Sequence, residues 1–179
     1  MSSKFNRVGL LIGPDSELEA MSIRSTIEYY GYQVETKWVG RPNDVLDCLR
    51  GQVFRKQTKV FVLCFHGKSG KFVMPKLASN VYVPGEPRSN LGAEELSQFN
   101  LTNKLILSTA CTVGKLALAK VFTARRNTYI AASGYVDGNA ALLFCHSFFF
   151  WLKEVADVVD AYERSSVIND QTRLFQKFT

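Results

Sequence analysis

The stretch "KLILSTACTVGK", Lys104–Lys115, decides how the rest of the chain is interpreted. Its apolar run is typical of a short strand that is buried on both faces of a parallel sheet. The chain then delivers Cys111 into a turn that contains Gly114. Cys111 is therefore either a small residue of the hydrophobic core or a nucleophile presented at a strand end.

Strand-like and helix-like patterns alternate on both sides of this stretch. Further strands are predicted at Arg7–Gly13, Tyr32–Val39, Lys59–Phe65 and Thr128–Ser133. Helical patterns fill the intervals, and the last third of the chain is predicted to be helical, with "SSVINDQTRLFQKFT" helical or frayed rather than a sixth strand. Strands that alternate with helices favour parallel pairing through right-handed crossovers. We expect an α/β protein, a three-layer sandwich with a mainly parallel central sheet of about five strands.

Two local patterns concern the connections between these elements. Ser16 is followed three residues later by Glu19, which predicts a capping box at the start of a helix. Residues 68–103 form an irregular insertion, in which "KFVMPKL" and "NVYVPGEP" suggest a hairpin and "GAEELSQF" a short helix. Within it, Ala78–Asn90 is a candidate lid or processing site, or simply an exposed connection.

Length and composition suggest one ordinary globular domain, residues 1–179. The four cysteines are widely spaced, so we expect no disulfide framework, no metal site and no cofactor; Cys48 is expected to be partly exposed. The net charge is +6, but the basic residues are scattered, so we do not expect a nucleic-acid partner. No signal peptide or membrane-spanning run is evident, and we expect a cytoplasmic protein without a membrane partner.

Two reactive side chains follow consecutive buried strands. His66 comes after the strand Lys59–Phe65, and Cys111 comes after the next one. Ligands of open α/β sheets bind beyond the carboxyl ends of the strands, where a histidine could activate a thiol. Gly67 could then bring its N–H to a substrate oxyanion, together with the N–H of Cys111. Each feature alone also fits an inert core cysteine and an ordinary turn.

These residues resemble those of the caspase-like (clan CD) cysteine peptidases. "VLCFHGKSG" and "LILSTACTVG" are similar to the His–Gly and Ala–Cys strand ends of the CHAT branch. "YIAASGYVDGNAALLFCHSFFFWL" resembles the fifth strand, loop and following helix of that branch, and "EVADVVDAYERSS" the helix after it. The similarity runs from about Arg7 to Ser166.

The resemblance implies a cysteine endopeptidase of protein substrates that works through a Cys–His dyad and an acyl-enzyme. Cys111 would be the nucleophile, and His66 would polarise the carbonyl or protonate the leaving amine. The amides of Gly67 and Cys111 would hold the oxyanion, with no fixed carboxylate as a third member.

The resemblance also places the primary specificity pocket at the loops after the first, fourth and fifth strands. Asp15, Thr109 and Asp137 occupy those positions here, where aspartate-selecting caspases carry arginines. We therefore expect cleavage after basic residues. Alternatively, Asp15 and Asp137 only favour the starts of the helices that follow them.

Three other expectations remain open. The lack of a clear sixth strand favours a monomer, and the lack of an attached sensor favours a regulatory protein partner. The chain could instead be a catalytically silent caspase-like interaction module in a regulatory or defence complex. A glutamine amidotransferase-like thiol enzyme fits less well, because "TACTV" lacks the glycines of a nucleophile elbow.

Overall fold

The computed structural model describes residues 5–179, and it confirms the α/β fold with a mainly parallel central sheet. The elements in chain order are β1 (Arg7–Ile12), α1 (Glu17–Tyr29), β2 (Gln33–Trp38), α2 (Pro42–Leu49), β3 (Val60–Cys64), β4 (Gly67–Lys68), β5 (Lys71–Phe72), β6 (Leu105–Ser108), α3 (Leu116–Thr123), β7 (Thr128–Ala132), α4 (Gly138–Val155), α5 (Val158–Ser166), the 3₁₀ turn η1 (Thr172–Leu174) and β8 (Phe175–Phe178). The main sheet has the order β2-β1-β3-β6-β7-β8, in which the first five strands are parallel. β2, which has a polar sequence, lies at the edge.

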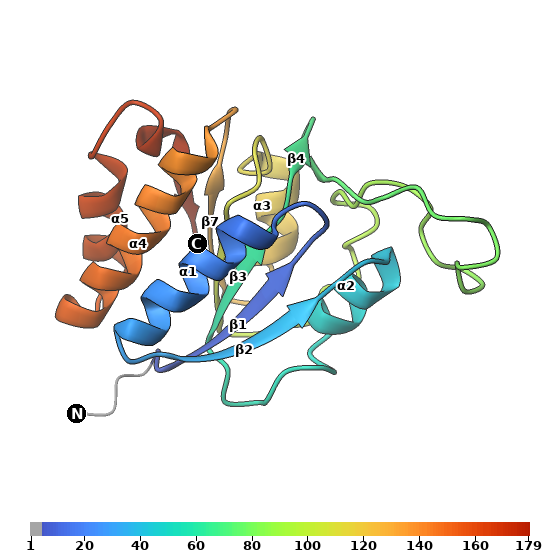
Figure 1. Ribbon diagram of the computed structural model, residues 1–179, viewed down its shortest axis with the longest axis horizontal. Helices are drawn as coiled ribbons and strands as arrows, with labels where there is room; N and C mark the ends of the chain where they lie inside the picture. Colours follow the sequence, from blue (N-terminus) through green and yellow to red (C-terminus); the bar gives the residue numbers. More distant parts are fainter. Residues whose placement is uncertain (1–4) are drawn as a thin grey trace.

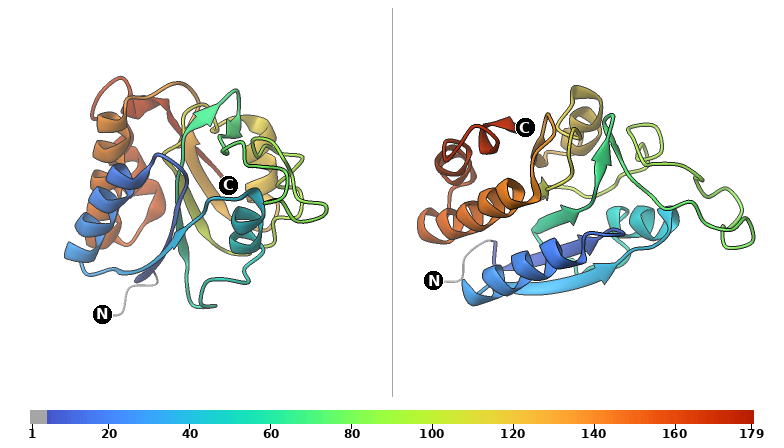
Figure 2. Two further views of the ribbon diagram at one scale, coloured as in Figure 1. Left: turned by 45° about the vertical axis from the view of Figure 1, so that its right-hand side comes forward. Right: turned by 45° about the horizontal axis from the view of Figure 1, so that its top comes forward.

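Helices cover both faces of the sheet and make three layers (Figures 1 and 2). α1, α4 and α5 pack on one face, and α2 and α3 pack on the other. Alternation along β3 sends Val62 and Cys64 toward α1 and α4, and Leu63 and Phe65 toward α2 and α3. None of the helices in residues 5–179 is both long and apolar enough to cross a membrane.

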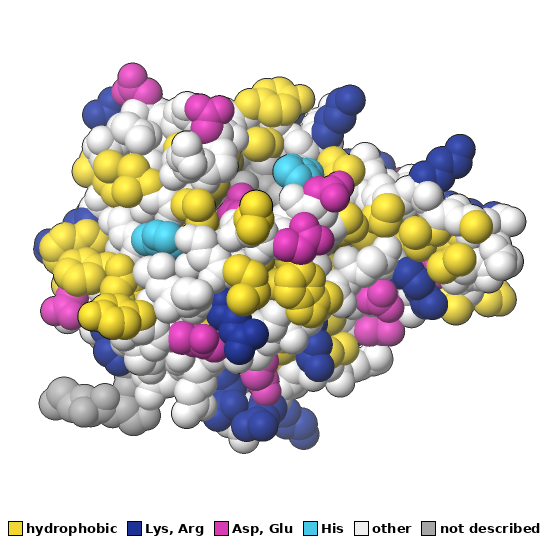
Figure 3. Space-filling model, viewed as in Figure 1, with side chains coloured by type: hydrophobic (Ala, Val, Ile, Leu, Met, Phe, Trp, Pro, Cys, Tyr) yellow, Lys and Arg dark blue, Asp and Glu magenta, His cyan; other side chains and the backbone are white. Residues whose placement is uncertain are grey.

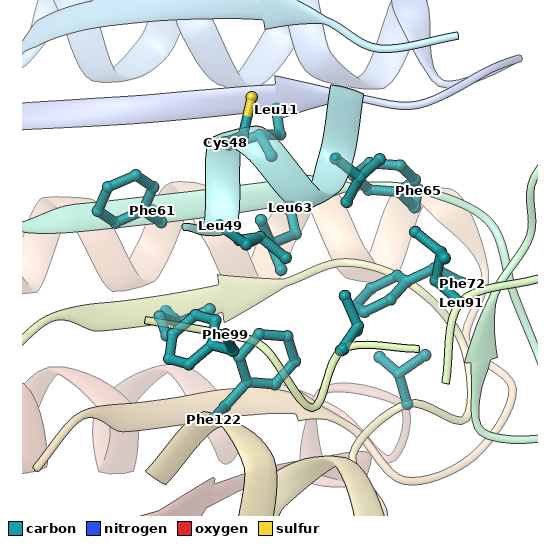
Figure 4. Packing of buried hydrophobic residues seen from close by; sticks show 14 of the residues in the cluster. Leu11, Cys48, Leu49, Phe61, Leu63, Phe65, Phe72, Leu91, Phe99 and Phe122 are labelled. Atoms are coloured by element: carbon teal, nitrogen blue, oxygen red, sulfur yellow. The ribbon is translucent and has the colours of Figure 1, made fainter. Parts of the chain in front are cut away.

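The face under α2 shows how completely the interior is filled. Figure 4 shows Cys48 of α2 beside Leu11 of the sheet, and Leu49 of α2 beside Leu63. Only 2% of Cys48 is exposed, so the expectation that it would be partly exposed was wrong. Cys48 lies on the buried side of α2, together with Val45, Leu46 and Leu49.

A sixth strand exists, contrary to expectation. β8 pairs with β7 in the antiparallel direction, and its first residue, Phe175, is fully buried. Phe175 stacks on Phe144 of α4 with ring centroids 4.0 Å apart. The sequence signal was weak because only Phe175 and Phe178 are apolar in this short edge strand. The expectation of a monomer was based on the lack of a sixth strand, so that reason no longer holds. The oligomeric state is not tested by the structure.

The insertion after β3 is also built differently from the prediction. β5 pairs with β4 in a tight hairpin, and Phe72 forms a bridge with Leu91, whereas "NVYVPGEP" forms no strand. "GAEELSQF" makes turns without becoming a helix. The buried side chains of Phe72, Leu91 and Leu96 fix this segment to the core in place of regular structure.

The start of α1 lacks the predicted capping box. Ser16 is the N-cap residue, but its hydroxyl donates to the carbonyl of Pro14 at 3.4 Å, and its side chain accepts no capping hydrogen bond. The carboxylate of Glu19 is thus not used at the helix terminus. Its position is important for the site described next.

Candidate active site

The pairing of β3 with β6 brings His66 and Cys111 to the same level of the sheet. Leu63 lies opposite Ser108 in this parallel pair. His66 and Cys111 each follow three residues beyond that paired position, at the carboxyl end of neighbouring strands. The expectation that the two strands are neighbours is therefore confirmed.

Gly67 lies directly against the backbone of Cys111. A Cβ atom at Gly67 would be 2.0 Å from the carbonyl oxygen of Cys111 and 2.9 Å from its nitrogen. This approach is possible only without a side chain, because real Cβ atoms do not come within 3.0 Å of other heavy atoms. The residue after His66 is thus in van der Waals contact with the candidate nucleophile's backbone.

The hairpin β4–β5 sets the direction of the Gly67 N–H. Val73 N–H donates to the His66 carbonyl, and both backbone groups of Phe72 bond to Leu91 on the outer side. Hydrogen-bonded and non-hydrogen-bonded pairs alternate in antiparallel ladders, so Gly67 and Phe72 form a non-hydrogen-bonded pair. The N–H of Gly67 therefore points away from β5.

Two hydrogen bonds hold the turn that contains Cys111. Gly70 N–H donates to the hydroxyl of Thr112 at 3.2 Å, and Thr112 N–H donates to the carbonyl of Gly134 at 2.9 Å. Thr112 has a positive φ of 63°, a conformation that non-glycine residues adopt only at a cost. The turn is thus fixed from both sides, by the β4–β5 hairpin and by the loop after β7.

His66 is exposed, and its Nε2 lies 3.1 Å from the backbone carbonyl of Asp15. A carbonyl oxygen only accepts hydrogen bonds, so this contact assigns the hydrogen to Nε2 in the neutral ring. Nδ1 then carries the lone pair that can take up a proton. The loop between β1 and α1 thereby orients the imidazole without a carboxylate.

Cys111 is half-buried, and its thiol contacts the loop after β7. Sγ lies 3.4 Å from both the carbonyl oxygen and the nitrogen of Val136. Within residues 5–179, these are the hydrogen bonds of the thiol, and none connects it to His66. The sulfur of Cys111 thus lies against the backbone of Val136.

The three residues expected to bind substrate have different environments. Asp15 is exposed and has a positive φ of 60°, and its backbone, not its carboxylate, contacts His66. Asp137 is exposed and exchanges two hydrogen bonds with Gln171, both 2.6 Å long. It is also the N-cap residue of α4, although its side chain does not cap the helix. Thr109 is buried, two residues before Cys111.

Sequence reasoning missed one ionisable residue at this site, Glu19. Burial raises the pKa of its carboxyl above the usual value, while the adjacent Thr109 hydroxyl and the charge of His66 act in the opposite direction. The capping-box pattern had instead predicted that this carboxylate forms a hydrogen bond at the N-terminus of the helix. Strand alternation could have revealed its position, because Cys64 of β3 and Thr109 after β6 fall on the face of the sheet that α1 covers.

The other reactive side chains lie away from this arrangement. Burial raises the pKa of Cys48 to about 12 and those of Cys64 and Cys145 well above their usual value. His146 is half-buried on α4, and burial lowers its pKa. No group of three or more potential metal-binding His, Cys, Asp or Glu side chains occurs in the described part of the chain.

The surface at this end of the sheet carries acidic groups although the protein is basic overall. Figure 3 shows acidic side chains close to a histidine on the face that it presents. A cavity of about 300 Å³ lies at the adjoining carboxyl ends of β1 and β2, lined among others by Pro14, Glu17 and Trp38. Neither His66 nor Cys111 lines this cavity.

Comparison with solved structures supports the fold. The chain is similar to a secreted C11 cysteine protease from Bacteroides thetaiotaomicron in complex with an irreversible peptide inhibitor, with 14% identity and a TM-score of 0.52 over 89% of this chain and 57% of that one. This chain therefore spans little more than half the length of that protease. At this identity the likeness shows the caspase-like fold alone.

Two further structures are less similar. A flavodoxin from Streptococcus pneumoniae has 11% identity and a TM-score of 0.46, covering 83% of this chain and 98% of its own. A second structure of the Bacteroides protease, "iotapain", has 10% identity and a TM-score of 0.47, covering 74% and 53%. No family model matches the chain, and no curated protein matches it in sequence.

Proposed function

We propose that the protein is a cysteine endopeptidase that uses Cys111 and His66 as a dyad. The observation that carries this proposal is the matched position of the two side chains, each three residues beyond paired residues of β3 and β6. Gly67 supplies a third element, since its backbone lies directly against that of Cys111. The caspase-like fold agrees with a peptidase site at these strand ends, but the proposal rests on the site, because one fold can carry many functions.

The reaction begins when the Cys111 thiol passes its proton to Nδ1 of His66 and the sulfur attacks the scissile carbonyl carbon. The N–H groups of Gly67 and Cys111 stabilise the oxyanion. His66 then protonates the leaving amine, and a thioester between Cys111 and the acyl fragment remains. Water attacks the thioester, its proton passes to the imidazole, and a carboxylic acid and the free thiol are released.

We further propose that the peptidase prefers a basic residue before the scissile bond. Asp15 and Asp137 lie on the two loops that border His66 and Cys111, and no arginine stands at the corresponding positions. Paired opposite charges in a partly desolvated site discriminate strongly among substrates. Control of this activity by a separate regulatory protein remains a prediction.

A catalytically silent interaction module is the second candidate. The contact between the Cys111 thiol and Val136 favours it, because the sulfur is bonded to the loop and not to His66. If the protein is a peptidase, binding of a substrate displaces this loop. The peptidase and the silent module differ in whether Cys111 reacts with a peptide-like electrophile.

Labelling with an electrophilic peptide probe tests the proposal. The wild-type protein is expected to be labelled at Cys111, whereas Cys111→Ala and His66→Ala are expected to lose the label. His146→Ala serves as the matched control, because this histidine lies on α4 and should not affect labelling. Equal labelling of the wild type and His66→Ala would overturn the dyad, and absence of labelling in all variants would favour the silent module.

A further inference from the structure

Trp38 is a large aromatic side chain that the fold itself does not use. It is the last residue of β2, the edge strand, and 56% of it is exposed. Within residues 5–179 its indole forms no hydrogen bond, ring stacking or cation–π contact. A single exposed apolar side chain is ordinary at a protein surface, so Trp38 is of interest because of the cavity that it lines.

This cavity, of about 300 Å³, has a mostly apolar lining. Ile12, Pro14 and Trp38 contribute apolar surface. Glu17, exposed at the start of α1, is the charged side chain of the lining. No atom lies within 4 Å of the Cβ position of Gly40, another lining residue, so there is free space at this point. The volume lies at the small end of ligand sites and therefore suits a single large side chain.

Backbone hydrogen bonds fix the strand ends on which the cavity is built. The N–H of Val39 donates to the carbonyl of Ile12 at 2.9 Å, which extends the pairing of β1 with β2 by one residue. The N–H of Gly13 donates to the carbonyl of Cys64 at 2.8 Å and extends the pairing of β1 with β3 in the same way. The cavity thus belongs to the rigid end of the sheet, where sites are held more precisely than on free loops.

The loop between β1 and α1 connects the cavity to the proposed dyad. Pro14 lines the cavity, and the carbonyl oxygen of the next residue, Asp15, lies 3.1 Å from Nε2 of His66. In the order of the sheet, Cys111 follows β6, His66 follows β3, and the cavity lies at the ends of β1 and β2. His66 is therefore placed between the nucleophile and the cavity along this edge.

This order sets the direction in which a substrate would lie. In the proposed reaction the sulfur of Cys111 bonds to the acyl carbon, while His66 protonates the leaving amine. The chain after the scissile bond thus starts at His66, and continuing along the edge brings it to the cavity. Neighbouring strands lie about 4.8 Å apart, so the cavity is about 12 Å from the end of β6. An extended chain advances about 3.3 Å per residue, so the side chain of the second or third residue reaches it.

We propose that this cavity holds a large apolar side chain of the leaving fragment, at the second or third residue after the scissile bond, and that Trp38 selects it. The proposal rests on the proposed peptidase function and adds a second point of specificity to it. A phenylalanine or leucine side chain would be removed from water between the indole and the apolar lining. An acidic side chain fits badly, because it would lie beside the carboxylate of Glu17.

The experiment uses substrates that share one acyl part, chosen from those that the wild type cleaves. One substrate carries an aminocoumarin leaving group and has no residue after the scissile bond. The others continue with alanines, or with phenylalanine or aspartate at the second or third of these positions. The wild type is expected to cleave the better phenylalanine peptide at least about tenfold more efficiently, in kcat/KM, than the alanine peptide. The aspartate peptides should be no better than the alanine peptide.

Two variants change the cavity in opposite ways. Trp38→Ala removes the aromatic side chain, and Gly40→Leu fills the free space. Each is expected to reduce the phenylalanine-to-alanine ratio to below about threefold, chiefly by raising KM for the phenylalanine peptide. Tyr29→Ala is the matched control, because Tyr29 is an exposed aromatic residue at the far end of α1 from the cavity, and it should keep the ratio.

The aminocoumarin substrate separates selection from a structural role. It has no side chain to place in the cavity, so the effect of Trp38→Ala should be confined to the phenylalanine peptides. Equal losses for the aminocoumarin substrate, the phenylalanine peptide and probe labelling of Cys111 would overturn the proposal, since Trp38 would then only support the loop that holds His66. Thermal unfolding checks that both variants are folded.

The remaining outcomes are also distinct. Equal cleavage of the phenylalanine and alanine peptides by the wild type, or a preference that Trp38→Ala retains, would overturn the proposal while leaving a peptidase. Failure of the wild type to cleave any peptide, with Cys111 unlabelled, would instead remove the peptidase proposal and this one with it.

Discussion

The thiol of Cys111 is bonded to both backbone polar groups of a single residue, Val136. Its Sγ lies 3.4 Å from the Val136 nitrogen and 3.4 Å from the Val136 oxygen. Val136 belongs to the short loop between β7 and α4. We therefore expect that loosening this loop makes the Cys111 thiol more reactive.

Gln171→Ala is expected to loosen this loop. Its side chain makes two hydrogen bonds to Asp137, the residue next to Val136, and connects the loop to η1. Removing one such interaction costs about 1 kcal/mol, so alkylation of Cys111 should become up to about fivefold faster. Arg173→Ala is the control, because Arg173 forms only an exposed ion pair with Asp170 nearby. A slower or unchanged rate in Gln171→Ala would show that the loop is not held by this pair.

Cys111 is expected to be the cysteine that iodoacetamide labels in the native protein. The thiolate is the reactive form, and burial both hides Cys48, Cys64 and Cys145 and raises their pKa values. Mass spectrometry of the alkylated protein should show one modification, and four after unfolding. Modification of native Cys111→Ala at a comparable rate would contradict this prediction.

The central strands, and the two reactive side chains that follow them, could be predicted from the sequence. β3 and β6 are continuous apolar runs, and the side chains that follow them were found by position alone. Their adjacency then follows from the pairing rules of parallel sheets. Local patterns thus placed His66 and Cys111 because the strands that carry them are strongly apolar.

The features that were missed depend on contacts through space. β8 is stabilised by the stacking of Phe175 on Phe144, and these residues are far apart in the chain. The Val136 contact and the environment of Glu19 likewise arise only when loops from different strands meet. A capping-box pattern even assigned Glu19 a local role that tertiary packing overrides.

Gly67→Ala is expected to disrupt the site. Its Cβ would lie 2.0 Å from the Cys111 carbonyl oxygen, so one of the two backbone segments must shift. Overpacking of this kind costs roughly 1–3 kcal/mol or more, and the oxyanion N–H would move with it. Gly138→Ala is the matched control, because no atom lies within 4 Å of its Cβ position. Probe labelling and thermal unfolding together check this, and full labelling of Gly67→Ala would contradict the close contact.

Phe175→Ala is expected to destabilise the protein by about 3–5 kcal/mol, as is typical for truncating a buried aromatic residue. Phe175 is fully buried between β7 and α4, so its loss leaves a cavity and weakens the attachment of β8. Denaturant unfolding measures the change. Lys177→Ala in the same strand is the control, since that residue is only half-buried and is expected to change stability little. Equal stability of the two variants would mean that β8 contributes little to the fold.

Glu86 is expected to fix the 78–90 segment, the candidate lid, in a pH-dependent way. Its carboxylate accepts hydrogen bonds from the N–H groups of Asn43 at 2.8 Å and Val83 at 2.9 Å, and lies 3.6 Å from Arg41. Burial acts to raise the pKa of Glu86, but these donors outweigh it, so its pKa lies below the usual 4.5. A lowered pKa means that the interaction stabilises the folded segment above that usual value and is lost as the pH falls through the folded pKa.

Hydrogen exchange of the Asn43 and Val83 amides measures this attachment. In the wild type, protection corrected for intrinsic exchange should hold at neutral pH and decrease below pH 4.5. In Glu86→Gln it should already be reduced at neutral pH and change less on acidification, because the charged acceptor is gone. Glu94→Gln, an exposed position in the same insertion, should behave as the wild type does. Wild-type protection that persists through the acid range would mean that packing, and not the Glu86 carboxylate, holds this segment.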